Sequence, residues 1–481
     1  MKFGLVIRYV GLIMLLNAAF MLISAVISLF NGFDTGFYPL LLSFLITSII
    51  GAFPLIFVPN DTNLSNKESY VVVIMAWIMS CLLGMLPYLI WGGEFTIANA
   101  WFESTSGFTT TGSTVLNDVE ALPKGLLFWR ASTHWIGGVG VVLFAIVILP
   151  SMGRLKTSLT SAEMSMMAKD NFRYTTKKIL QIIIVVYVGL TLCETVALIA
   201  VGMDWFDALT HSFSTVATGG FSTKNLSIMY YDSLAIEMTT AFFMIVSGLH
   251  MGLVYATIRG KRNNLFRSEV ARFYILSLAI CTVIVSASLL LNHNYSTVGE
   301  ALRYGVFQVA SYTTTTGFAS ANDAFWPPLA MIVLIYCTMQ CAMAGSSAGG
   351  IKADRVLLIF KAIKARVLKL QHPNAVIRIK QNGITQDDGM VNAAILLVVI
   401  YLLSALAGTV ILAAMNIDLL TGFTASITSL SNVGPGFGKV SNLDNYGWMP
   451  DTAKWLLSGL MLFGRLEFFG FIHIFMLRSW K

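Results

Sequence analysis

Long apolar stretches alternate with short polar segments along the whole chain. A helix needs about 20 mainly apolar residues to cross a membrane. The first stretch follows a basic N-terminus, but it is too long for a typical signal peptide and lacks a convincing cleavage site, so we count it as a span. The pattern therefore predicts an all-α membrane protein with ten spans, near residues 9–30, 37–58, 70–91, 126–150, 179–201, 234–257, 273–291, 327–345, 391–415 and 455–477.

Composition agrees with this pattern. Of the 481 residues, 56% are apolar and 11% are charged, whereas soluble proteins carry about 25% charge. These values exclude a cytosolic enzyme, a disordered protein and a nucleic-acid binder. The five cysteines fall in apolar stretches and are odd in number, so we expect packing residues rather than a disulfide framework.

Basic residues set the predicted orientation, because cytoplasmic loops of membrane proteins are enriched in Lys and Arg. With the N-terminus inside, the predicted inner segments hold 24 of the 31 basic residues and the outer segments hold five. We therefore expect both termini in the cytoplasm.

The outer segments after the first two spans form an internal repeat. Four times, a span is followed by an outer segment that starts with apolar and aromatic residues and ends in Ser, Thr and Gly. Aligned on Gly112, Gly219, Gly317 and Gly434, the steps are 107, 98 and 117 residues, which indicates a fourfold repeat. A purely structural scaffold would leave the four matched motifs unexplained.

Each of these segments is too apolar for a solvated loop and too short to cross the membrane and return. Thr297 and Glu300 form a predicted capping box, and Asp204 and Asp418 are acidic helix starts. We therefore expect a short helix that dips into the protein, followed by an extended stretch.

Such an arrangement suits a cation. Extended backbone at membrane depth is tolerated where it lines a watery cavity, and its carbonyl oxygens can replace the hydration shell of an alkali ion. The helices would direct their negative C-terminal ends at the ion. The alternative is close helix packing, which also uses small residues and Thr.

The four motifs resemble the pore loops of the Trk/Ktr/HKT family of potassium transporters. They read Thr110-Thr111-Gly112-Ser113, Ala217-Thr218-Gly219-Gly220, Thr315-Thr316-Gly317-Phe318 and Asn432-Val433-Gly434-Pro435. The resemblance covers essentially the whole chain, and the two extra N-terminal spans are similar to the bacterial TrkH/TrkG branch. It implies a fourfold pseudosymmetric pore within one chain, a homodimer and a location in the bacterial inner membrane.

The resemblance also implies a selectivity filter that binds the transported potassium ion. Gly at all four aligned positions favours potassium over sodium in this family. The fourth motif departs most from the Thr-Gly pattern. The implied metal-binding residues are Thr110, Thr111, Gly112, Ala217, Thr218, Gly219, Thr315, Thr316, Gly317, Asn432, Val433 and Gly434.

A Gly/Ser-rich stretch follows the third motif, at the end of its returning span. Three glycines within six residues cost a continuous helix roughly 3 kcal/mol, so we expect a loop at membrane depth. The resemblance makes this loop the gate; a Gly-rich packing face is the alternative. The expected gate residues are Gly345, Ser346, Ser347, Gly349, Gly350, Lys352 and Arg465.

Arg465 lies inside the last predicted span, where a charge is costly and usually faces a cavity or a partner. We expect it to form an electrostatic barrier below the filter and to contact the loop 345–350. The alternative is a structural ion pair with Glu467 or Glu194.

A basic segment, residues 352–380, follows the loop. It could dock a regulatory subunit or acidic lipid, or simply set topology. The resemblance implies a cytosolic, nucleotide-binding TrkA-type partner. The expected organisation is two N-terminal spans, three pore repeats, a basic linker and a fourth repeat, with boundaries 1–66, 67–153, 154–262, 263–352, 353–390 and 391–481.

No enzyme motif or cluster of metal-ligating side chains stands out in the sequence. The competing function is a proton- or sodium-coupled secondary transporter of a cation. Such folds usually show inverted repeats, whereas these four repeats run in the same orientation, and Glu194 is the candidate proton-coupling group.

Overall fold

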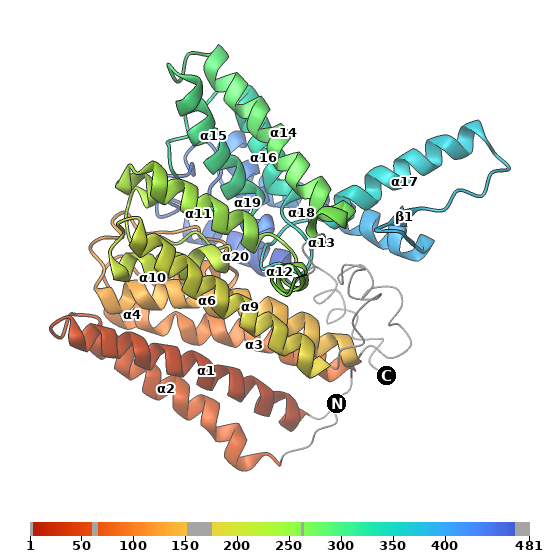
Figure 1. Ribbon diagram of the computed structural model, residues 1–481. Coiled ribbons are helices and arrows are strands. Elements are labelled where there is room, and N and C mark those ends of the chain that lie inside the picture. Colours follow the sequence, from red (N-terminus) through yellow and green to blue (C-terminus); the bar gives the residue numbers. More distant parts are fainter. Residues whose placement is uncertain (1–2, 60–65, 152–175, 261–263, 467–481) are drawn as a thin grey trace.

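The structure is a computed structural model that describes residues 3–59, 66–151, 176–260 and 264–466. The described chain is helical, apart from one small hairpin (Figure 1). Two N-terminal helices, α1 (Phe3–Phe30) and α2 (Phe37–Phe57), pack along each other, and α1 also packs against α3 (Asn66–Gly84).

After α1 and α2, one order of elements occurs four times: a long helix, a short helix, an irregular segment and a returning helix. The long helices are α3 continued by α4 (Leu86–Trp91), α9 (Thr176–Ala200), α14 (Glu269–Leu291) and α18 (Asp388–Ala414). The short helices are α5 (Ile97–Phe108), α10 (Trp205–Val216), α15 (Val298–Thr313) and α19 (Leu419–Ser431). The returning helices are α6 (Lys124–Ser151), α11 (Leu234–Ser247) with α12 (Met251–Ile258), α16 (Pro328–Gln340) and α20 (Asp451–Arg465).

The remaining elements lie in connections. They are the 3-10 helix η2 (Ser227–Tyr231), α13 (Asn264–Arg267), α17 (Ala353–Gln371) and the antiparallel strands β1 (Lys380–Gln381) and β2 (Ile384–Thr385). Helix α17 projects away from the other helices, with the hairpin close to its base (Figure 1).

Six described helices are long and apolar enough to cross a membrane, and a seventh span results if α11 and α12 are counted together. Helices also lie in the three other predicted stretches, but α16 has 13 residues and α20 has 15. The expected span near 327–345 therefore ends early, at Gln340, because the next residue, Cys341, takes a positive φ of 55°. The Gly/Ser-rich stretch follows four residues later. Residues 467–477 of the last stretch lie outside the described residues.

The expected span near 234–257 is broken, since α11 and α12 meet at an angle of 106°. The His250 ring accepts a hydrogen bond from the backbone N–H of Gly252 (3.0 Å) and so starts α12. At the break, Gly248 O accepts from Met343 N (3.1 Å) and Met251 N donates to Gly345 O (3.2 Å). The break thus provides hydrogen-bond partners for backbone groups of the loop after α16.

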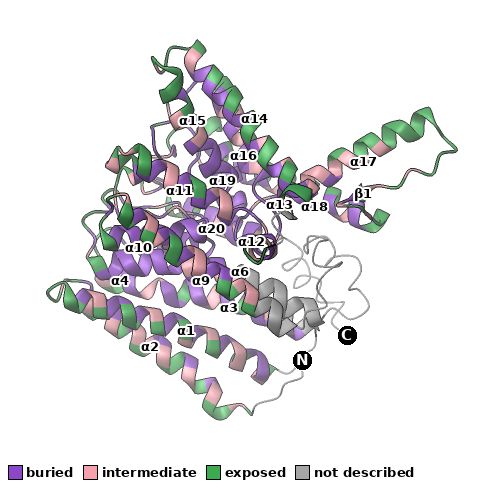
Figure 2. Ribbon diagram, in the orientation of Figure 1, coloured by how far each residue is buried: buried purple, intermediate pink, exposed green. Residues whose placement is uncertain are grey.

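Burial is concentrated where the short helices meet. In Figure 2 the buried residues follow α10, α19 and α20, whereas α17 is largely exposed. Many of the buried residues on the short helices are Ser and Thr. A polar interior inside an apolar exterior is the reverse of a soluble domain, and it is what a pathway for an ion requires.

Candidate functional site

All four short helices begin with a side-chain cap. Asp204, Thr297 and Asp418 accept hydrogen bonds from the backbone N–H groups of Phe206, Glu300 and Thr421, respectively. These three starts were predicted from the sequence. Thr96, which caps α5 through the N–H of Asn99, was missed because no acidic residue follows in its first turn.

All four short helices also end in the same way. Just beyond each helix, one residue donates its N–H to the carbonyl of the residue five positions earlier, at 2.8–3.0 Å. The donor and acceptor pairs are Thr111–Ser106, Gly219–Ser214, Thr316–Ser311 and Val433–Thr428. This is the long bond of a Schellman motif. The residue before it takes a left-handed conformation, with φ of 53–60°, in Thr110, Thr218, Thr315 and Asn432.

Left-handed Thr is uncommon, because a β-branched side chain crowds its own backbone there. Strain of about 1–3 kcal/mol per residue is retained where the surrounding structure fixes it, and such sites cluster at functional positions. Three of the four turns use Thr and the fourth uses Asn, a residue that enters this conformation more easily.

The next glycine of each motif touches the following motif, and the four contacts close a ring. A Cβ on Gly112 would lie 2.1 Å from the carbonyl oxygen of Gly219, one on Gly220 1.9 Å from that of Thr316, one on Gly317 2.2 Å from that of Val433, and one on Gly434 2.5 Å from that of Thr111. All four glycines have positive φ, from 78° to 100°. Only glycine fits such a position.

The second motif is therefore shifted by one residue from the sequence alignment. Gly219 does not have a positive φ, and a Cβ there would meet the ring of His134. Gly220 occupies the place of Gly112, Gly317 and Gly434. The alignment on Gly219 was wrong, although the sequence contains evidence for the correct one. A Thr or Asn stands two residues before each glycine of the ring; in the second motif this holds for Gly220, which Thr218 precedes, and not for Gly219. Ala217 therefore lies one residue before the positions that correspond to the predicted potassium-binding residues of the other motifs.

A cavity of about 120 Å³ lies against this ring. The four glycines of the ring line it, and so do the irregular segments that follow them. Its other lining groups are mainly polar, with Asn117, Asn225, Asn442 and Asn445 among them. The ring is thus reached through a polar mouth.

Polar side chains of the short helices hold the segments that follow the glycines, and the sequence reading missed them. Glu103 on α5 accepts from Thr114 Oγ1 and Val115 N (both 3.0 Å). His211 on α10 pairs with Ser222 Oγ at 2.9 Å, and Gln308 on α15 donates to Ala321 O at 2.9 Å. They stand five residues before the C-terminal residue of α5, α10 and α15, respectively. They were missed because single polar residues within apolar segments form no distinctive sequence pattern.

The Gly/Ser-rich stretch forms an irregular loop between α16 and α17 that lies against the short helices. Ser347 Oγ donates to Val216 O (2.8 Å), and Gly349 N donates to Thr315 Oγ1 (3.2 Å). A Cβ on Gly349 would lie 2.2 Å from Ser431 O. The loop therefore contacts the second, third and fourth motifs on the side of the helix ends.

Arg465 is buried and binds backbone carbonyls. Its Nη1 donates to Ser347 O at 2.8 Å, and its Nη2 to Gly137 O at 3.4 Å. The expected contact between Arg465 and the loop is present. Glu194 makes no ion pair with Arg465, since both of its carboxylate oxygens lack a hydrogen-bond partner; Glu467 lies outside the described residues.

Asp354, at the start of α17, holds the other end of the loop. Its Oδ2 accepts from Ala344 N at 2.6 Å. Burial raises the pKa of the Asp354 carboxyl to about 6, and the Ala344 N–H and the charges of Arg355 and Lys352 partly offset this rise. Gln381 on β1 donates to the carbonyl of Asp354 (3.2 Å), so the hairpin is tied to the same point.

Basic residues line α17 and the hairpin outside this junction. Most of the segment 352–380 is exposed, and Lys361 pairs with Glu269. Among the described residues, no group of three His, Cys, Asp or Glu side chains could hold a metal ion. The five cysteines are unpaired, and four of them are buried.

Comparisons with known proteins agree over the full length. Residues 40–479 match the TrkH family, described as a cation transport protein. The chain is 35% identical to the Trk system potassium uptake protein TrkH of Halomonas elongata and 33% identical to that of Escherichia coli, with 100% of each chain covered. It is 31% identical to the crystal structure of the potassium transporter TrkH from Vibrio parahaemolyticus, with a TM-score of 0.90 and full coverage of both chains.

The match thus extends over the four motifs, the loop and α20, and the family is one of transporters rather than enzymes. The chain belongs to the TrkH family of cation transport proteins.

Proposed function

We propose that this protein takes up potassium selectively across the bacterial inner membrane, through a pore whose filter is built by the four glycine motifs. The observation that carries the proposal is the closed ring of glycine–carbonyl contacts between motifs. Relatives that share a third of its residues are named potassium uptake proteins. Backbone carbonyls suit a dehydrated alkali ion, because they supply oxygen ligands without a fixed charge.

The proposed ligands are the backbone carbonyls of three consecutive residues in each motif, in the register of the ring. They are Thr110, Thr111, Gly112, Thr218, Gly219, Gly220, Thr315, Thr316, Gly317, Asn432, Val433 and Gly434. In this register the carbonyl oxygen of Gly219 remains a proposed ligand, equivalent to that of Thr111. Gly220 takes the position of the ring glycine.

The loop 345–350 is the proposed gate, with Arg465 as an electrostatic barrier beneath the filter. The hydrogen bonds from Ser347 to Val216 and from Arg465 to Ser347 support this role. Lys352, the residue before α17, has a φ of 75° and would serve as the hinge between the gate and the cytosolic arm.

The ten-span topology and the domain boundaries predicted above complete the proposal. The four-unit order of helices supports four pore repeats after two extra spans. The excess of Lys and Arg in the predicted inner segments supports cytoplasmic termini. A homodimer follows from the family resemblance alone.

The basic helix α17 and its hairpin are the proposed docking site for a cytosolic, nucleotide-binding TrkA-type subunit. Their exposed positive charge and their direct chain connection to the gate support this. A pull-down with and without residues 352–380 tests it: loss of the subunit on deletion is expected, and unchanged capture contradicts the site.

Cation flux through purified protein in liposomes tests the main proposal. With potassium and sodium gradients imposed separately, potassium should cross much faster. Equal rates would leave a pore without selectivity. If neither ion crosses, the Arg465→Ala variant separates a closed gate from a wrong assignment.

A proton-coupled mechanism is the second candidate, because Glu194 is buried in α9 and neither carboxylate oxygen has a hydrogen-bond partner among the residues that the structure describes. Coupling predicts that protons enter together with potassium and acidify the vesicle lumen, and that Glu194→Gln abolishes this signal. Potassium flux with no lumenal pH change contradicts coupling.

A further inference from the structure

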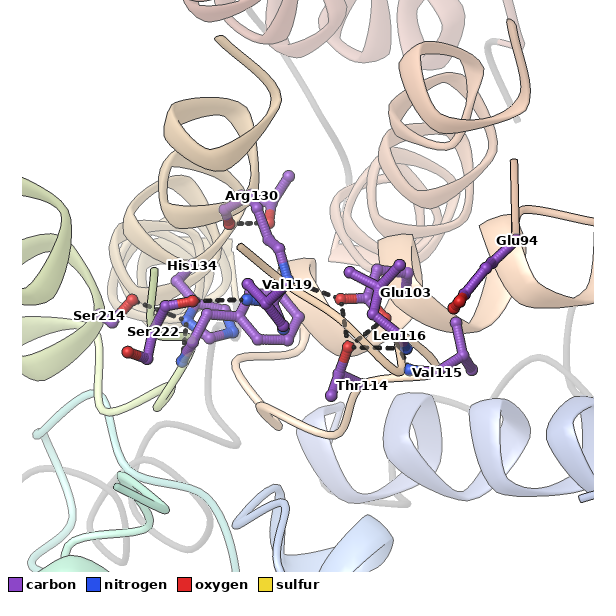
Figure 3. Close-up of polar contacts among 12 residues, drawn as sticks. Glu94, Glu103, Thr114, Val115, Leu116, Val119, Arg130, His134, Ser214 and Ser222 are labelled. Carbon is purple, nitrogen blue, oxygen red and sulfur yellow. Dashed lines mark hydrogen bonds and ion pairs between the residues drawn. The ribbon is translucent and has the colours of Figure 1, made fainter. Parts of the chain in front are cut away.

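A buried ion pair joins the segments that follow the first two glycines of the ring. Glu103 lies on α5 and Arg130 on α6, and Arg130 Nε donates to Glu103 Oε1 at 2.6 Å. Both side chains are almost fully buried, with 0% and 4% of their surface exposed. Figure 3 shows the pair between Thr114 and Val115 on one side and Ser222 on the other.

Each member of the pair holds a different motif. Glu103 accepts from Thr114 Oγ1 and Val115 N, two and three residues after Gly112. Arg130 Nη1 donates to Ser222 O at 2.9 Å, and its guanidinium lies 3.6 Å from the ring centre of Phe221, directly after Gly220. The pair therefore fixes the distance between the first and second motifs.

The other neighbouring motifs are joined by neutral contacts. Ala319 N donates to the hydroxyl of Ser227, Ala319 O accepts from Met229 N, and the Asn442 amide donates to Ala321 O. Tyr446 N donates to Thr114 O between the fourth and first motifs. Arg303 on α15 also joins the third unit to the second by charge, but its partner Asp232 lies twelve residues after Gly220. Among ion pairs between described residues, only Glu103–Arg130 contacts residues within three positions of the glycines of two motifs.

Stability alone does not account for the pair. Desolvation of two charges is costly, and well-packed apolar residues of similar size are often as stable as a buried ion pair. What a charged, forked pair adds is geometry, because Arg presents several donors in a rigid plane. Arg130 also lines the polar cavity against the ring. Glu103 cancels a positive charge that would otherwise repel incoming cations.

We propose that the Glu103–Arg130 pair is a positioning device of the filter: it holds the first and second motifs at the spacing that favours potassium over sodium, and it neutralises Arg130 at the mouth of the pathway. This inference rests on the proposed potassium filter. Glu103 and Arg130 act through the motifs and need not touch the ion.

Potassium and sodium flux in liposomes tests the proposal with paired variants. Glu103→Gln keeps the size of the side chain but leaves Arg130 without a counter-charge. Arg130→Lys keeps the charge but loses the planar fork to Ser222. The control is Glu237→Gln, since the buried Glu237 pairs with the partly exposed Arg303 at 2.7 Å. The other acidic partner of Arg303 is Asp232, twelve residues after Gly220.

Wild-type protein must first prefer potassium, and equal fluxes there would overturn the proposed filter instead. Given that preference, we expect both variants to lower the potassium-to-sodium flux ratio about tenfold or more, as for a lost charged hydrogen bond. Only Glu103→Gln should also slow potassium entry at low external concentration, and Glu237→Gln should keep the ratio. A wild-type ratio in folded Glu103→Gln and Arg130→Lys overturns the proposal.

Thr114→Val decides the question if the charged variants do not fold. It removes one donor to Glu103 and leaves the ion pair in place. Folding is followed by size-exclusion elution in detergent. A lowered ratio in folded Thr114→Val supports the positioning role, and an unchanged ratio contradicts it.

Discussion

The side-chain amide of Asn432 donates a hydrogen bond to Thr111 Oγ1 at 3.0 Å, although 321 residues separate the two. The same amide donates to Met461 O on α20 at 3.0 Å. The fourth motif thus binds the first across the closure of the ring. Its departure from the Thr-Gly pattern has a physical reason, because Asn tolerates the left-handed turn and reaches two neighbours with one amide.

Gly220→Ala should damage the filter as severely as Gly112→Ala. At both positions a Cβ would lie within about 2 Å of a carbonyl oxygen of the next motif, and φ is positive. We expect loss of the potassium preference and a cost of about 1–3 kcal/mol in stability. Gly459→Ala is the control, since nothing lies within 4 Å of a Cβ there. Normal selectivity in Gly220→Ala would refute the corrected register.

Arg465→Ala should raise potassium flux. The variant removes a buried positive charge and the hydrogen bond that holds Ser347. Because each 1.4 kcal/mol of barrier corresponds to a factor of ten, we expect an increase of about tenfold or more. Arg465→Lys retains the charge and should stay close to wild type. Unchanged or lower flux in correctly folded Arg465→Ala contradicts the barrier role.

Gly349→Ala should open the gate loop. A Cβ there would meet Ser431 O at 2.2 Å and Asn432 Oδ1 at 3.0 Å, so the loop must move away from the fourth motif. We expect a higher resting potassium flux in liposomes. Gly189→Ala on α9 is the matched control, since nothing lies within 4 Å of a Cβ there. Equal fluxes in the two variants would argue against the loop as the gate.

Asp354→Asn should change how stability depends on pH. Burial raises the pKa of Asp354 from 3.8 to about 6. A raised carboxyl pKa favours folding while the group is protonated, and this contribution is lost as pH rises through about 6. The variant should therefore gain in melting temperature relative to wild type as pH increases from 5 to 7, and then level off. A constant difference across this range would show that Asp354 does not titrate there.

The sequence predicted the helical class, three of the four short-helix starts and the contact of Arg465 with the loop. These follow from local signals: apolar length, capping residues and a charge within a span. It did not predict the break between α11 and α12 or the register of Gly220. The break depends on a loop almost 100 residues further along the chain, and the register depends on contacts between motifs. Glu103 and Arg130 were missed for the same reason, since their partners come from distant segments.

The central claim is that the ring of four glycine motifs binds potassium. Anomalous diffraction from crystals in which rubidium replaces potassium tests it most directly. The account predicts rubidium peaks on the axis of the ring, surrounded by the carbonyl oxygens of Thr111, Gly219, Thr316 and Val433. Ordered motifs without a peak there, or peaks coordinated only by other residues, would contradict it.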